Sequence, residues 1–267
     1  MSQVTTNDRV RQVATTLSAA AMLVGTLFGI GVLGERVAES SGGSLSATAT
    51  LLAPASTAFS IWSVIYLGLA AYVVWQWVPR TAASTRGRSI GWLAALSMLL
   101  NGGWLLVTQA GWLWGSVLVI VVLALTLGLI MERLTSLRPE GGTIERIVVD
   151  GTFGLYLGWV TVATVANIAA TLADSGVEPG QGTAELLAVV VLAAAAAVGT
   201  FLACRLGGRR GVAAAMAWGL GWIAVGRAAT EPESTVTAVA AAAAAVLVVA
   251  ATVAARACKT EARGRAV

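Results

Sequence analysis

Three segments of the chain carry neutral aromatic and polar side chains that recur at the spacing of one helix face. Within each segment, neighbouring members of the set stand three or four positions apart. Aromatic, phenol and amide groups arranged in this way can stack on a flat apolar ligand and orient it, without making or breaking bonds. The candidate ligand-binding residues are Phe59, Trp62 and Tyr66, then Asn101 and Trp104, and finally Tyr156, Trp159, Ala163 and Asn167.

The two asparagines in this set have two interpretations. An amide surrounded by hydrocarbon is costly unless it is paired, so Asn101 and Asn167 should point into a helix bundle. There they could bond another helix and serve the structure alone. They could also line a cavity in which the small side chain of Ala163 leaves room for a ligand. The sequence leaves both interpretations open.

The composition excludes most bond-making chemistry. The chain has no histidine and only two cysteines, so imidazole-ligated metal, a thiolate metal cage and a Ser/His/Asp triad all lack their central groups. We therefore expect no catalytic residue, no metal ligand and no required cofactor. The sequence favours a protein that is not an enzyme.

The overall composition places these segments in a membrane. Of 267 residues, 57% are hydrophobic and 11% are charged, whereas soluble domains carry about 25% charged residues. A helix needs about 20 apolar residues to cross a bilayer. The charges leave room for eight crossings, so the predicted fold class is an all-α, polytopic membrane helix bundle. The predicted spans are 14–34, 57–78, 90–108, 112–131, 151–173, 186–204, 211–226 and 234–255.

The basic residues give an independent test of the eight spans, because cytoplasmic loops are enriched in Lys and Arg. Eight spans place 15 of the 17 basic residues on one side and leave only Arg36 and Arg227 on the other. The sequence therefore predicts a protein of the cell membrane with both termini in the cytoplasm. The basic residues are distributed among the short cytoplasmic loops, as membrane insertion alone requires. The pI of about 9.7 therefore indicates no nucleic-acid partner.

Tryptophan divides the chain into two parts, because eight of the ten tryptophans lie between Trp62 and Trp159. We expect a cytoplasmic N-terminal segment 1–14, a five-helix ligand-binding core 15–173, a three-helix extension 174–255 and a basic cytoplasmic tail 256–267. The loop 35–56 either folds over the outer mouth of the core or is a solvated linker. Five tryptophans near span ends are expected to anchor the protein at the membrane interface: Trp75, Trp77, Trp92, Trp112 and Trp114.

Three motifs resemble those of the tryptophan-rich sensory protein family, also called translocator or peripheral benzodiazepine receptor proteins. PASTAFSIWSVIYLGLAAYVVWQ at 54–76 is similar to the opening of that family's second helix. LLNGGW at 99–104 resembles the L-N-x-x-W of its third helix, and LYLGWVTVATVAN at 155–167 resembles a motif of its fifth. The three motifs occur in the family's order and cover the five-helix core.

This resemblance implies a cavity within the five-helix bundle, closed by the loop after the first helix and lined by the candidate residues. The family binds porphyrins and other tetrapyrroles, and in animals cholesterol and benzodiazepine-type drugs. Two departures concern the shape of the site. The family's double proline before the second helix is reduced here to Pro54 followed by Ala55, and the proline before the fifth-helix tyrosine is Leu155.

The leading hypothesis is an integral membrane receptor or sensor that binds a planar apolar ligand, such as a porphyrin, inside the bundle. One alternative is a transporter or exporter of small hydrophobic molecules, in which Arg227 acts as a gate. A second alternative is light-dependent porphyrin degradation. The expected partners are the lipid bilayer and the small hydrophobic ligand, and small-residue helix faces also allow a homodimer.

Overall fold

A computed structural model describes residues 3–264 of the chain, with side chains up to residue 260. Most of the described residues are helical, and they hold no β-strand, apart from one isolated bridge between Ile30 and Arg36. Within this part of the chain, eight helices are long and apolar enough to cross a membrane. The prediction of an all-α bundle with eight spans is therefore confirmed. The predicted basic tail 256–267 lies partly outside the described residues.

Short irregular helices join or precede the long ones. A 3-10 turn, η2, leads into α2, while a short helix, α5, and a π-helical turn, η3, lead into α6. The helices are α1 (Thr6–Gly29), η1 (Ser41–Gly43), η2 (Ser56–Ser60), α2 (Ile61–Trp77), α3 (Thr85–Gln109), α4 (Leu113–Ser136), α5 (Gly142–Glu145), η3 (Arg146–Gly151), α6 (Thr152–Asp174), α7 (Gln181–Leu206), α8 (Arg210–Ala229) and α9 (Thr235–Gly264).

The first span is displaced toward the N-terminus relative to its prediction. Helix α1 begins at Thr6 because Thr5 and Asp8 form a capping box, in which each side chain bonds the backbone N–H of the other. It ends at Gly29, and the chain then turns at Gly31, whose φ of 79° is accessible mainly to glycine. The five residues that follow α1 therefore belong to the connecting loop and not to the span.

The predicted span 211–226, the least apolar of the eight, also forms a helix. Helix α8 has 20 residues and extends the predicted 211–226 at both ends. Helix α9 continues from Thr235 to Gly264, well past the end of its apolar stretch. Alanine, arginine, lysine and glutamate dominate this continuation, and all four residue types favour a helix in water.

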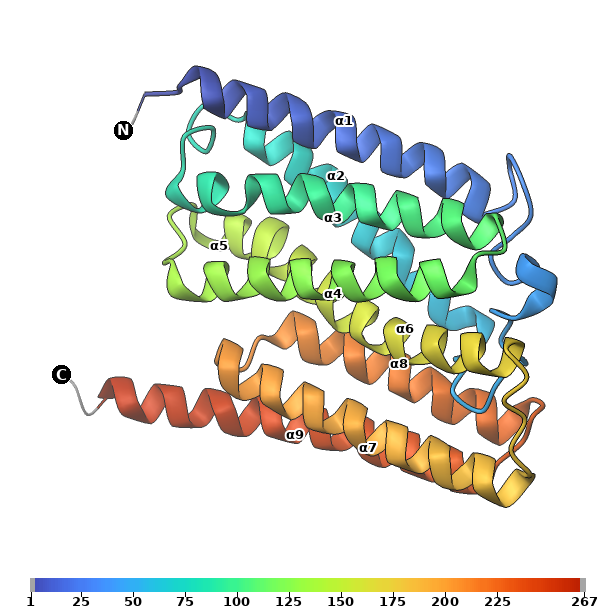
Figure 1. The fold of residues 1–267 in the computed structure, drawn as a ribbon. Helices are drawn as coiled ribbons and strands as arrows, with labels where there is room; N and C mark the ends of the chain where they lie inside the picture. The colour runs from blue at the N-terminus through green and yellow to red at the C-terminus, as the bar shows by residue number, and fades with distance from the viewer. Residues whose placement is uncertain (1–2, 265–267) are drawn as a thin grey trace.

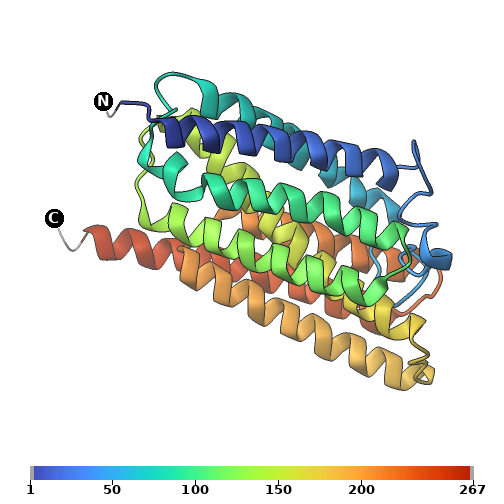
Figure 2. The ribbon, with the colours of Figure 1, turned by 45° about the horizontal axis from the view of Figure 1, so that its top comes forward.

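Five helices form a closed ring. Helix α1 packs on α3, α3 on α4, and α4 on α6, while α2 closes the ring by contacting both α1 and α6. Figure 1 and the rotated view in Figure 2 show α2 lying behind α1 and α3. Helices α1 and α3 approach each other backbone to backbone, because a Cβ atom on Gly25 would lie 2.9 Å from the Cα of Gly102. Any larger residue at position 25 would push these helices apart.

The last three spans pack on one side of the ring. Helix α8 lies along α6, α9 packs on α8, and α7 packs mainly on α9 (Figure 1). A Cβ on Gly158 of α6 would collide with the backbone carbonyl of Val212 on α8. The extension is therefore mounted on the ring through a backbone-to-backbone contact between α6 and α8.

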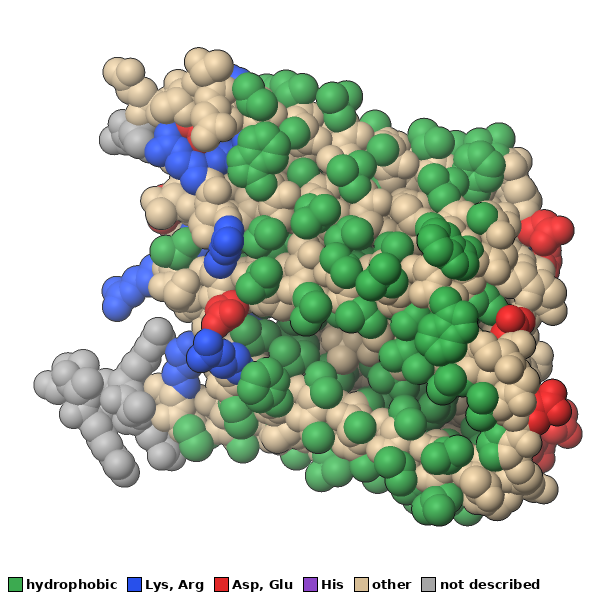
Figure 3. Space-filling model, viewed as in Figure 1, with side chains coloured by type: hydrophobic (Ala, Val, Ile, Leu, Met, Phe, Trp, Pro, Cys, Tyr) green, Lys and Arg blue, Asp and Glu red, His purple; other side chains and the backbone are tan. Residues whose placement is uncertain are grey.

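The two ends of the bundle differ in charge. The described chain begins and finishes at the same end of the bundle, as an even number of spans requires (Figure 1). Lys and Arg side chains gather at that end on the face shown in Figure 3, and acidic side chains dominate the opposite end. We call the end with the termini the basic end. We call the opposite end, where the loop 30–55 lies, the lid end.

Most of the five tryptophans that were predicted to anchor the protein at the membrane interface lie at the surface. The side chains of Trp77, Trp92, Trp112 and Trp114 are exposed near the ends of their helices, as interfacial anchors would be. Trp75 is different, and its prediction as an anchor was wrong. It is buried and stacks on Tyr72, with ring centroids 6.0 Å apart, because this face of α2 points into the bundle.

Candidate ligand-binding site

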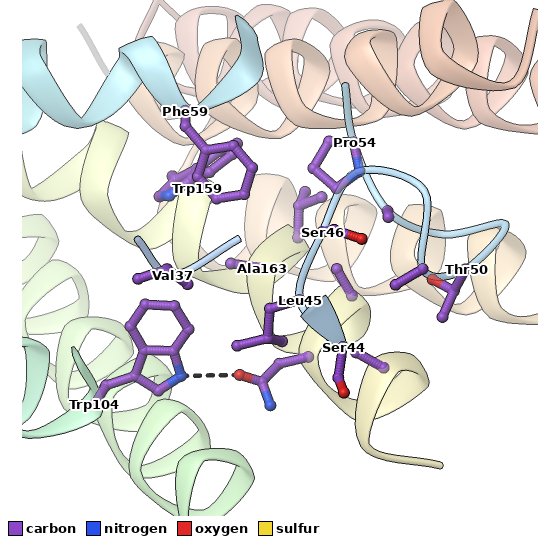
Figure 4. A pocket seen from close by; sticks show the side chains of 16 residues that line it. Val37, Ser44, Leu45, Ser46, Thr50, Pro54, Phe59, Trp104, Trp159 and Ala163 are labelled. Atoms are coloured by element: carbon purple, nitrogen blue, oxygen red, sulfur yellow. Dashed lines mark hydrogen bonds between the residues drawn. The ribbon is translucent and has the colours of Figure 1, made fainter. Parts of the chain in front are cut away.

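The ring encloses a cavity of about 50 Å³ near the lid end of the bundle. Its wall consists of α3, α6, the turn η2 and the loop that follows α1 (Figure 4). A second cavity of about 20 Å³ adjoins it and shares four wall residues, Phe59, Trp104, Trp159 and Ala163. The two cavities together define the candidate site.

Seven of the nine candidate residues line these cavities: Phe59, Trp62, Asn101, Trp104, Trp159, Ala163 and Asn167. The two tyrosines do not line either cavity. The hydroxyl of Tyr66 donates to the side-chain oxygen of Asn101 at 3.1 Å, and the hydroxyl of Tyr156 donates to the backbone oxygen of Ser97 at the same distance. The tyrosines therefore hold the wall in place from behind.

Aromatic rings form one wall of the site. The ring of Trp159 meets those of Phe59 and Trp62 edge to face, with centroids 5.7 Å and 6.2 Å apart. Trp62 in turn meets Tyr156 edge to face at 5.9 Å and packs against Tyr66 at 5.3 Å. Such contacts fix the orientation of each ring, so this wall is a preformed apolar surface.

Asn167 uses its amide to join three helices. Its side-chain oxygen accepts a hydrogen bond of 2.8 Å from the indole N–H of Trp104 on α3, drawn as the dashed line in Figure 4. Its amide nitrogen donates to the hydroxyl of Ser116 on α4 at 2.9 Å. Asn167 therefore pairs between helices, as the structural interpretation expects, and it also borders the larger cavity.

Two buried polar atoms of the larger cavity's wall have no hydrogen-bond partner. They are the indole nitrogen of Trp159, whose side chain is 1% exposed, and the hydroxyl oxygen of Thr50. An unpaired buried polar group costs roughly 1–3 kcal/mol. Both atoms are covered in the closed site, so a bound molecule that carries hydrogen-bond acceptors would reach them once the wall moves apart.

The loop between α1 and η2 covers the larger cavity. We call residues 30–55 the lid. The lid is held by hydrogen bonds from the hydroxyl of Ser44 to a carboxylate oxygen of Asp174 at 2.6 Å and from that of Ser41 to the backbone oxygen of Thr108 at 3.0 Å. The loop therefore folds over the mouth and is not a solvated linker. The cavity-lining residues of the lid are Val37, Ser44, Leu45, Ser46, Ala49, Thr50, Ala53 and Pro54.

Sequence reasoning did not identify these lid residues. A loop of Ser, Gly, Thr and Ala has no periodicity that marks one residue as inward-facing. It also missed Ser116 and three small apolar residues of α6, namely Val162, Ala166 and Ala170. Ala166 and Ala170 stand three and seven positions after Ala163, so the same helical spacing could have found them.

The departure from the family pattern at Ala55 has a structural counterpart. The backbone N–H of Ala55 donates to the backbone oxygen of Trp222 on α8 at 3.2 Å. A proline at this position has no N–H and could not make that bond. The missing second proline therefore allows the lid to bond the C-terminal extension.

No charged side chain belongs to the described wall of either cavity. Charges concentrate instead at the basic end, where Arg86 is fully buried and bonds Glu145 and Asp150, each at 2.7 Å. Arg209, which precedes α8, also bonds Asp150. Sequence reasoning did not predict this cluster, which joins α3, the segment before α6 and the start of α8. Among the described residues, no group of three or more His, Cys, Asp or Glu could hold a metal ion.

These features define a class of protein: a polytopic helical membrane protein with an aromatic-walled internal cavity beneath a folded loop. The chain belongs to the TSPO-like protein family, whose model matches residues 12–253. The match confirms the resemblance seen in the three motifs and extends it through the three C-terminal spans. Membership indicates a membrane protein of receptor or transport type. Neither a curated protein nor a solved structure matches the chain.

Proposed function

We propose that this protein is a membrane receptor or sensor that binds a planar apolar ligand of the tetrapyrrole type between the five helices of the ring. The observation that carries this proposal is the combination of a rigid aromatic wall with two unpaired polar atoms, on Trp159 and Thr50, around one cavity. Aromatic faces suit a flat conjugated ligand. The hydroxyl of Thr50 and the indole N–H of Trp159 are donors that suit acceptor groups on the edge of such a ligand.

Ligand binding requires the site to open. The larger cavity holds about 50 Å³, whereas pockets for drug-sized ligands span about 300–1,000 Å³. The closed arrangement has room for a few water molecules at most. Displacement of the lid, which forms half of the wall, is the movement that enlarges the site with the least disturbance of the ring.

The absence of charge from the described cavity walls favours a receptor over an ion-coupled transporter. Coupling of transport to an ion gradient needs ionisable groups near the substrate, and the walls offer only aromatic, aliphatic, hydroxyl and amide groups. For the orientation, we propose that the basic end faces the cytoplasm of the cell membrane, because cytoplasmic loops carry the excess of Lys and Arg. Both termini would then be cytoplasmic.

The test is a binding titration of the purified full-length protein with protoporphyrin, in which the absorption spectrum of the porphyrin reports binding. Trp62, Tyr66, Asn101 and Trp159 are each replaced by Ala or Leu, and Trp112→Ala is the control because Trp112 is exposed outside both cavities. We expect at least about tenfold weaker binding for Trp62→Ala and Trp159→Ala, because each loses a buried aromatic contact. Unchanged affinity in all four variants would rule out this site.

Two further measurements separate the alternatives. Porphyrin flux across proteoliposomes containing the protein would show a transporter, and tight binding without flux supports a receptor. Illumination of the protein with bound porphyrin, followed by analysis of products, tests for light-dependent degradation. The contact between Trp62 and Trp159, with ring centroids 6.2 Å apart, offers a route for an electron in that reaction.

A further inference from the structure

Helix α8 contacts the lid and the turn after it at three successive points, although α8 lies outside the five-helix ring. The guanidinium of Arg227 donates to the backbone oxygen of Ala47 at 2.8 Å. The backbone oxygen of Trp222 accepts from the N–H of Ala55 at 3.2 Å, as described above. The indole N–H of Trp218 donates to the backbone oxygen of Ala58 at 2.9 Å. The second half of α8 thus runs beside the last part of the lid and the turn that leads into α2.

Of these three contacts, the one made by Arg227 involves a charged side chain. Its side chain is 0% exposed, and among the described residues it forms no ion pair. Its guanidinium donates to two backbone carbonyls, those of Ala47 in the lid and Pro232 in the loop after α8, the latter at 2.9 Å. The carboxylate of Glu231 in the same loop also favours its charge. A buried charge is strongly unfavourable without partners. Movement of the lid away from α8 would remove one of these two partners, so Arg227 opposes that movement.

The residues around this contact leave little space between lid and helix. A Cβ on Gly226 would lie 3.3 Å from the backbone nitrogen of Ala55, which is tighter than ordinary contact. Ala55 has an extended backbone with φ of −55° and ψ of 149°. A proline fits these angles, so Ala55→Pro would remove the bond to Trp222 without requiring a new backbone conformation.

Helix α8 is itself fixed to the ring along its length. At the basic end Arg209 bonds Asp150, and in its first half the backbone of Val212 packs against Gly158 of α6. The position of Arg227 therefore follows from the packing of the extension on α6. A lid bonded to α8 is bonded to an element that the ring holds in place.

We propose that the C-terminal extension controls access to the cavity by holding the lid closed against α8. Arg227 and Ala55 are the positioning residues, the first through its guanidinium and the second through its backbone N–H. This inference rests on the proposed function for its ligand, although the lid movement that it describes can be measured without one. Weakening the contact should speed both the uptake and the release of a ligand. A contact that only stabilised the fold would not raise the uptake rate.

The experiment measures lid opening without a ligand. A probe cysteine, Ala163→Cys, is placed in the wall shared by both cavities, and the exposed Cys204 and Cys258 are replaced by Ser. The full-length protein in micelles is treated with a small, charged methanethiosulfonate, and the rate of modification is measured in three backgrounds: Arg227→Gln, Ala55→Pro and Trp218→Phe. Trp77→Phe is the matched control, because it removes an indole bond to Thr16 of α1 that lies away from both α8 and the lid.

We expect modification to be about tenfold faster with Arg227→Gln and about threefold faster with Ala55→Pro or Trp218→Phe, at an unchanged melting temperature for the latter two. Arg227→Lys should restore part of the slow rate. Equal rates in Ala55→Pro, Trp218→Phe and the parent protein would overturn the inference, even if Arg227→Gln failed to fold. If the rates rise as expected but protoporphyrin does not bind, the lid inference stands and the proposed ligand class is wrong.

Discussion

The indole N–H of Trp104 on α3 donates a hydrogen bond of 2.8 Å to the side-chain oxygen of Asn167 on α6. Both residues border the larger cavity, and the amide nitrogen of Asn167 reaches Ser116 on α4. One buried amide therefore sets the positions of three helices around the candidate site. Its removal should affect stability and binding together.

Asn167→Leu is expected to lower the free energy of unfolding by about 1–3 kcal/mol, because it leaves the Trp104 N–H unpaired in a buried place. Trp104→Phe should cost about 1 kcal/mol, and the double variant should show a coupling of about 0.6–1.5 kcal/mol. The measurement is unfolding of the four proteins by SDS in mixed micelles. Fully additive effects would show that the bond contributes nothing.

Trp159→Phe separates binding from stability. The change removes an indole N–H that has no partner and keeps an aromatic ring in the wall. We expect the free energy of unfolding to fall by no more than about 2 kcal/mol, because loss of the unsatisfied N–H offsets part of the cost of the cavity that the smaller ring leaves. Protoporphyrin affinity should nevertheless fall about threefold to tenfold. Full affinity in Trp159→Phe would show that the indole N–H makes no contact with the ligand.

The contact between α6 and α8 tolerates no side chain at Gly158. Gly158→Val should destabilise the protein by at least about 2 kcal/mol and loosen the extension, because the added atoms collide with the backbone of Val212. Gly103→Ala on α3 is the control, since no heavy atom lies within 4 Å of its Cβ position. The control should leave stability unchanged or slightly increased. Melting of both variants by circular dichroism provides the comparison.

The buried charge cluster at the basic end should be far more sensitive than ion pairs at the surface. Asp150→Asn leaves the fully buried Arg86 with a weaker partner and is expected to cost about 3–5 kcal/mol. Arg205→Gln breaks the exposed pair with Glu132 and should cost about 0–1 kcal/mol. Similar losses in both variants would contradict the burial of this cluster.

The helical spacing of the sequence identified the aromatic and amide part of the cavity wall, which seven of the predicted residues form. Neutral aromatic and amide side chains such as Trp104 and Asn167 cannot face lipid without losing hydrogen bonds, so their faces had to point inward. The same reasoning could not separate residues that line a cavity from those that support it. Tyr66 and Tyr156 share the faces of the lining residues, and only the packed structure shows that they stand behind the wall.

The lid and the charge cluster depend on contacts that no local pattern encodes. Ala47 is held by Arg227, 180 positions away in the chain. Arg86 and Asp150 are separated by 64 positions, and in the sequence each resembles an ordinary charge of a cytoplasmic loop. Trp75 failed as a predicted interfacial anchor for a related reason, because its place near a span end says nothing about which side of the helix is buried.

The most direct test of the central claim fills the cavity and asks whether binding is lost. Ala163 borders both cavities, and Ala70 is exposed on the outer face of α2. Titration with protoporphyrin should give one binding site per chain in the parent protein and in Ala70→Leu, and at least about tenfold weaker binding in Ala163→Leu at comparable stability. Equal affinity in Ala163→Leu and Ala70→Leu would place the ligand outside the five-helix ring and overturn the proposed binding site.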